Sequence, residues 1–123
     1  MKLYHATYRP LIRSIKKHGL GGKASRYRWC DSKDGVVYLA TDAGVAESYA
    51  EVNEEVPEEW TDDIVIFCVD SDSLDNDKLF IDDNVLDNDG STLEYHGVIP
   101  YSALRVVDVL DERVQMFVGS LLN

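Results

Sequence analysis

The sequence has 123 residues, and its 12 Lys and Arg against 23 Asp and Glu give a formal net charge of −11 at pH 7. This length predicts one domain over residues 1–123, and a hydrophobic content of 45% excludes a disordered chain. With no run of about 18 apolar residues, no signal-peptide pattern and two cysteines, Cys30 and Cys68, the sequence indicates a cytoplasmic protein without a membrane span or a disulfide scaffold.

The basic residues are concentrated at the start of the chain. Residues 1–33 carry nine Lys and Arg and one acid, for a charge of +8, whereas residues 34–123 carry three Lys and Arg and 22 acids, for −19. A separation of this size can attract a phosphate-bearing ligand to one face. The alternative is that the two parts interleave in the fold and neutralise each other.

In the first half of the chain, the patterns predict a strand, a helix, a basic loop, a strand and a second helix: residues 2–7, 10–18, 21–35, 36–40 and 41–52. Pro10 suits the first turn of its helix, and the glycines from Gly19 onward end it. Thr41 or Asp42 is a suitable N-cap for the second helix.

In the second half, strands are expected at residues 64–69, 78–81, 93–99 and 104–110, with acidic segments at residues 51–63 and 82–90. The strand at 64–69 is apolar throughout, which predicts a central position covered on both sides. Trp60, in the first acidic segment, is expected to dock on the body of the protein. Two early helices followed mostly by strands predict an α+β domain.

Three familiar site patterns do not fit this sequence. Asp87–Gly90 has its glycine at the wrong offset for a calcium-binding EF-hand loop, and Gly19–Lys23 lacks the spacing of a phosphate-binding loop. The three histidines, at positions 5, 18 and 96, lack the H-E-x-x-H spacing of zinc hydrolases.

A different set of residues has a recognisable order. His5 lies in the first predicted strand, within Tyr-His-Ala-Thr. Tyr38 lies in the second strand, and Tyr49 follows in the next helix with ten residues between the two tyrosines. Glu94 lies in a late strand, where alternation turns it away from its apolar neighbours.

This set resembles the His-Tyr-Glu class of mono- and poly-ADP-ribosyltransferases, whose fold is shared by diphtheria-type toxins and poly(ADP-ribose) polymerases. That family carries His-Gly-Thr on its first strand, two tyrosines on the second strand and following helix, and the acid on a later strand. The same order runs here from residue 4 to about residue 99, and the short length is similar to the small members that modify rifamycins. The resemblance implies a split β-sandwich with an NAD cleft between two small sheets.

The resemblance also implies the chemistry, which is cleavage of NAD with release of nicotinamide and transfer of ADP-ribose to an acceptor. It assigns catalysis to Glu94, His5 and Tyr38, with the Glu94 carboxylate beside an oxocarbenium-like ribose. Tyr38 and Tyr49 would sandwich the nicotinamide ring, where offset stacking contributes about 0.5–1.5 kcal/mol. The full set of NAD-binding residues that it implies is His5, Ala6, Thr7, Arg9, Tyr38 and Tyr49.

The sequence departs from the family pattern at two positions. Ala6 replaces the usual glycine after the histidine, and a backbone contact there survives if φ is negative. Thr92 occupies the place, two residues before Glu94, where one branch of toxins carries a second acid that helps direct transfer to arginine. Transfer to arginine is therefore not supported.

Two other functions remain open at this point. The RNA 2′-phosphotransferases share the opening histidine and use NAD, but they place a second histidine where Tyr38 stands. A non-enzymatic, acidic interaction protein would carry these residues as a degenerate site. For a transferase, the net negative charge favours a protein or small-molecule acceptor over nucleic acid.

Overall fold

The computed structural model describes residues 1–21, 35–51, 56–82 and 90–122. Within these ranges the chain forms six strands, three α-helices and five short 3-10 helices: β1 (Lys2–Tyr8), η1 (Arg9–Leu11), α1 (Ile12–His18), β2 (Val37–Ala40), α2 (Ala43–Glu51), η2 (Glu58–Trp60), β3 (Ile64–Asp70), η3 (Ser71–Ser73), η4 (Asn76–Lys78), β4 (Leu79–Ile81), β5 (Thr92–Tyr95), η5 (Tyr101–Ala103), β6 (Arg105–Val107) and α3 (Val109–Leu122). The protein is a mixed α+β structure, as the sequence predicts.

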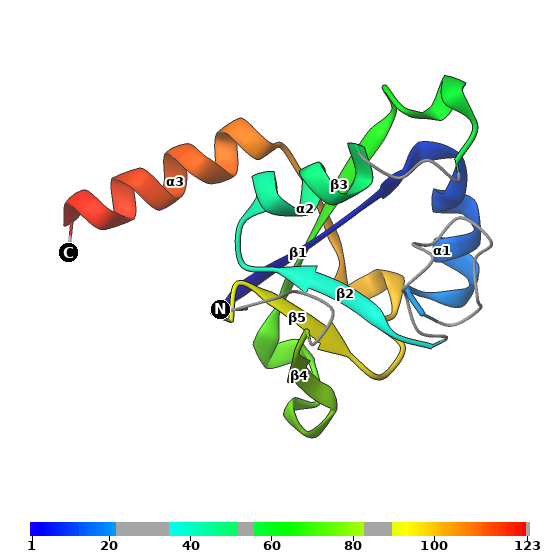
Figure 1. Ribbon diagram of the computed structural model, residues 1–123. Coiled ribbons are helices and arrows are strands. Elements are labelled where there is room, and N and C mark those ends of the chain that lie inside the picture. Colours follow the sequence, from blue (N-terminus) through cyan, green and yellow to red (C-terminus); the bar gives the residue numbers. More distant parts are fainter. Residues whose placement is uncertain (22–34, 52–55, 83–89, 123) are drawn as a thin grey trace.

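The strands belong to one antiparallel sheet with the order β4-β5-β2-β1-β3-β6. β1 pairs with β3 along its whole length, and β2 pairs likewise with β5. Among the described residues, β1 and β2 share one registered pair, Tyr4 with Ala40, which we call the join. From the join the two halves of the sheet diverge, and Figure 1 shows β2 and β5 running at an angle to β1. The prediction of two separate sheets is therefore wrong, because this narrow join makes the sheet continuous.

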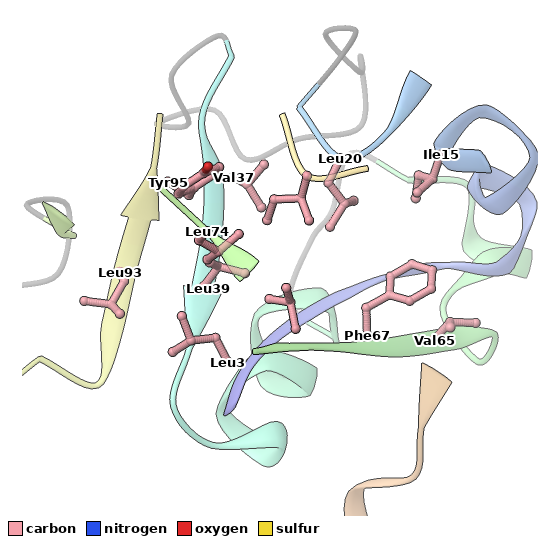
Figure 2. Close-up of a cluster of buried hydrophobic side chains, with 12 residues drawn as sticks. Leu3, Ile15, Leu20, Val37, Leu39, Val65, Phe67, Leu74, Leu93 and Tyr95 are labelled. Atoms are coloured by element: carbon pink, nitrogen blue, oxygen red, sulfur yellow. The ribbon is translucent and has the colours of Figure 1, made fainter. Parts of the chain in front are cut away.

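One face of the sheet carries the larger hydrophobic core. Alternation along the strands brings Leu3, Leu39, Phe67 and Leu93 to this face, and all four are at most 8% exposed. Figure 2 shows these side chains filling the space between the diverging halves, with Ile15 of α1 packed at one end. The core therefore holds the two halves together where backbone hydrogen bonds do not.

The opposite face of the sheet is covered by α2. Ala43 and Ala46 of this helix pack on Tyr4, Ala40 and neighbouring residues of β3. The side chain of the predicted cap residue Asp42 accepts hydrogen bonds from the backbone N–H groups of residues 44 and 45, at 2.7 and 3.1 Å. These bonds satisfy amides that have no partner inside the helix, which fixes where α2 begins.

α1 ends at a glycine, as the sequence predicts. Gly19 has φ of +76°, a conformation that side chains disfavour, and a Cβ added there would lie 2.7 Å from the carbonyl oxygen of Ile99. The next residue, Leu20, pairs with Ile99 as an isolated bridge. The end of α1 is thereby tied to the segment that follows β5.

The end of the chain differs from its prediction. The expected strand at residues 104–110 is wrong beyond Val107, since β6 ends there and α3 begins at Val109. The side chain of Asp108 accepts hydrogen bonds from the backbone N–H groups of residues 110 and 111, so it caps α3. In Figure 1, α3 extends away from the rest of the molecule.

The other predicted elements have mixed outcomes. The strand expected at 93–99 ends at Tyr95, whereas β3 is buried from Val65 to Val69 as predicted. Trp60 packs against Tyr8, with 6.3 Å between ring centroids, which confirms its docking. Residues 22–34 of the predicted basic loop and residues 83–89 of the predicted acidic loop lie outside the described residues. No helix in the described ranges is both long and apolar enough to cross a membrane.

Candidate functional site

Tyr38 and Glu94 are direct neighbours on adjacent strands. The register of β2 and β5 places Tyr38 opposite Glu94, and the register of β4 and β5 places Phe80 on the other side of Glu94. Residues paired in this way project to the same face of a sheet. Glu94 is only 2% exposed, although the strand that carries it is next to the edge of the sheet. The register of the strands therefore places a buried acid directly beside a tyrosine.

His5 is linked to the same place through the backbone. Its Nδ1 lies 2.8 Å from the carbonyl oxygen of Tyr38, and a carbonyl only accepts, so Nδ1 is the donor. Burial lowers the pKa of His5 from its usual 6.5, while the hydrogen bond to Tyr38 acts in the opposite direction. The ring is therefore neutral near pH 7, with its Nε2 as a hydrogen-bond acceptor.

The side chains of His5 and Glu94 project from opposite faces of the sheet. Along β1, His5 alternates with Tyr4 and lies opposite Phe67, a residue of the larger core. Tyr38 and Glu94 lie on the other face, which they share with Ala40. Among the described contacts, the link between His5 and this second group is the hydrogen bond from His5 Nδ1 to the backbone carbonyl of Tyr38.

Tyr49 reaches the site from α2. Its hydroxyl oxygen is 3.4 Å from the Oγ1 atom of Thr92, which is 3% exposed and lies two residues before Glu94 on β5. Alternation places Thr92 and Glu94 on the same face. Thr92 therefore places a hydroxyl on the same face as Glu94, in contact with the hydroxyl of Tyr49.

The remaining predicted residues follow along β1. Ala6 lies opposite Ile66 and is partly buried against α2, and Thr7 is 6% exposed. Arg9 lies just after the strand, where its Nε donates to Asp63 Oδ1 at 2.8 Å. As a ligand for phosphate, Arg9 would share its charge with this carboxylate.

His96, for which the sequence predicts no role, contacts the predicted catalytic acid. His96 Nε2 lies 3.1 Å from Glu94 Oε1, and the ring packs edge-on to Phe80 with 5.0 Å between centroids. The signal in the sequence is the spacing, because His96, just after the end of β5, continues the two-residue alternation of Glu94. It is a weak signal, since such pairs are common on exposed strands.

A cavity of about 290 Å³ lies elsewhere, between the start of β1, the end of β3 and β6. Lys2, Cys68 and Arg105 are among its lining residues, and none of the predicted site residues is. Among the described residues, no group of three or more His, Cys, Asp or Glu could hold a metal ion.

Comparisons with protein-family models, curated proteins and solved structures found no match.

Proposed function

We propose that the protein is an NAD-dependent mono-ADP-ribosyltransferase with its site at the join between β1 and β2. The observation that carries this proposal is the convergence of residues distant in sequence. His5 binds the Tyr38 carbonyl, Tyr38 lies opposite Glu94, and Tyr49 contacts the residue two before Glu94. These are the residues whose order in the sequence resembles the His-Tyr-Glu class.

Glu94 supplies the main catalytic effect in this proposal. Cleavage of the bond between nicotinamide and ribose builds positive charge on the ribose, and a nearby carboxylate stabilises that charge. At about 4 Å and an effective dielectric constant of about 20, the attraction is about 4 kcal/mol, or roughly three powers of ten in rate. The burial of Glu94 supports this role, since a carboxylate screened from water interacts more strongly.

The neighbouring residues would bind the substrate. His5 would accept a hydrogen bond from a ribose hydroxyl at Nε2, since its Nδ1 is held by Tyr38. The backbone of Ala6 would bind the nicotinamide amide, and the rings of Tyr38 and Tyr49 would enclose the nicotinamide. Thr7 and Arg9 continue along the same strand end, toward the rest of NAD.

The test is nicotinamide release from NAD by the purified protein and by Glu94→Gln. We expect the substitution to lower the rate by about 10²–10⁴-fold while NAD binding changes little, because it removes an interaction made mainly in the transition state. Glu112→Gln is the matched control, since Glu112 is also a buried acid, 3% exposed, but lies in α3. Its rate per folded molecule should equal that of the wild type.

Other outcomes would select a different function. Equal rates of nicotinamide release by the wild type and Glu94→Gln would show that Glu94 is not catalytic. Absence of both release and NAD binding would favour the acidic interaction protein. If NAD is consumed only with an RNA that carries a 2′-phosphate, the protein would be a 2′-phosphotransferase. Binding without release would require an acceptor, which tagged NAD in a cell lysate would reveal.

A further inference from the structure

Glu94 and His96 form a pair with unequal exposure. The Nε2 and Oε1 atoms are 3.1 Å apart, and the side chains are 41% exposed for His96 but 2% for Glu94. The position of His96 is fixed from two further directions, since its backbone N–H donates to the Lys78 carbonyl at 2.8 Å and its ring packs on Phe80. The imidazole therefore lies between the buried carboxylate and solvent.

With Glu94 ionised, its contact with Nε2 selects one tautomer of the neutral ring. An ionised carboxylate only accepts hydrogen bonds, so Nε2 is the donor and, in the neutral ring, Nδ1 carries the lone pair. If Nδ1 takes up a proton, the resulting positive charge is stabilised by Glu94. A carboxylate that orients an imidazole and stabilises its charged form is the arrangement by which enzymes make histidine a general base.

We propose that His96 is the base that accepts the acceptor's proton, an inference that rests on the proposed transferase function. The acceptor's lone pair forms a bond to C1′ of the ribose, and the bond from C1′ to nicotinamide breaks, with its electron pair leaving on nicotinamide. The acceptor's proton passes to Nδ1 of His96 and is later lost to water. Glu94 thereby serves both the ribose and the base.

This assignment also narrows the chemical class of the acceptor. A hydroxyl or an amine must lose a proton as it bonds to C1′, and it benefits from a base at that place. A carboxylate acceptor is already ionised near pH 7 and needs none. The pair of Glu94 and His96 therefore indicates a protic acceptor, which is a hydroxyl or amine group.

The test compares two probe nucleophiles in the nicotinamide-release assay: methanol, which must lose a proton, and azide, which has none. His96→Gln keeps a side-chain N–H group to bond Glu94 but removes the basic nitrogen. We expect this variant to form the methyl glycoside about 10²–10⁴-fold more slowly than the wild type and the azide product at the wild-type rate. His18→Gln, at a partly exposed histidine on α1, is the control and should change neither rate.

The outcomes separate this inference from the proposed function. If His96→Gln loses both reactions equally, His96 only positions Glu94 and the inference is wrong. It is equally wrong if neither rate changes. If the wild-type protein neither binds NAD nor releases nicotinamide with either nucleophile, the proposed function fails and this inference with it. Glu94→Gln should lose both reactions, which distinguishes the acid from the base.

Discussion

His5 illustrates how one side chain can serve the structure and also take part in the proposed function. Its Nδ1 replaces a backbone donor at the Tyr38 carbonyl, close to the point where the ladder between β1 and β2 ends. Burial disfavours the charged ring, so this bond is made by neutral imidazole. The same neutrality leaves Nε2 as an acceptor, which in the proposed function binds a ribose hydroxyl.

The first prediction concerns the pH dependence of stability. Because the pKa of His5 is lower in the folded protein than its usual 6.5, the unfolded chain binds more protons in the interval between the two values. Stability from neutral His5 is therefore complete above about pH 6.5 and is lost as the pH falls through that interval. His5→Asn keeps an N–H donor for Tyr38 but does not titrate.

Urea unfolding of the wild type and His5→Asn between pH 5 and pH 8 would measure this effect. The difference in unfolding free energy between the two proteins should rise with pH and level off near neutrality. His18→Asn provides the comparison for a histidine outside the site. A difference that stays constant over the whole range would show that His5 does not titrate on unfolding.

Single residues also show what the sequence could and could not predict. The alternation of side chains along a strand correctly predicts that Glu94 faces away from Leu93 and Tyr95, because the two-residue period is a property of one strand. The contact between Glu94 and Tyr38 depends on the register of two strands, and a single strand does not determine it. His96 was missed for a related reason, since burial of its partner comes from the neighbouring strands.

At the scale of elements, the C-terminal helix was the main error. Residues 104–110 contain several β-branched residues, which locally favour a strand. Asp108 interrupts that pattern and caps α3, and the acids at positions 111 and 112 lie in the first turn, where the helix dipole favours them. The sequence contains these signals for the start of a helix, but the β-branched residues around Asp108 favour the prediction of a strand. The ends of α1 and α2 could be predicted because their signals, Gly19 after α1 and Asp42 before α2, do not lie within a run of β-branched residues.

α3 is attached to the sheet by a buried carboxylate. Glu112 Oε2 accepts hydrogen bonds from the Tyr4 hydroxyl at 3.2 Å and from Lys2 Nζ at 3.3 Å, and Arg105 lies 3.7 Å from the other oxygen. Burial and the charge of Glu112 both raise the pKa of Tyr4, so its hydroxyl remains a donor. The first strand and the last helix are thus connected through this group.

The second prediction tests this connection with a double-mutant cycle. Glu112→Ala leaves the hydroxyl of Tyr4, which is 1% exposed, without its acceptor, and should lower the unfolding free energy by about 1–3 kcal/mol. Adding Tyr4→Phe removes that hydroxyl, so the double variant should lose less stability than the sum of the two single variants. Chemical denaturation measures all four proteins. Strictly additive losses would mean that the two side chains do not depend on each other.

For the whole molecule, the decisive feature is a sheet whose halves are joined at one registered pair. β1 and β3 exchange hydrogen bonds along their full length, whereas β1 and β2 meet at Tyr4 and Ala40 before they diverge. Local opening of the join breaks few backbone hydrogen bonds, so it should require less free energy than opening the β1–β3 ladder. The proposed site lies at this weak point.

The last prediction follows from that position. In amide hydrogen exchange without a ligand, the amides of β2 that face β1, those of Tyr38 and Ala40, should exchange faster than residues 65–69 of β3. NAD that contacts His5 on one half of the sheet and Tyr38 and Glu94 on the other would hold the halves together. At an NAD concentration of about 100 times its dissociation constant, amides that exchange through opening of the join should slow by about 100-fold. Protection confined to one half would place NAD away from the join, because a ligand that binds one half alone leaves the opening of the other unchanged.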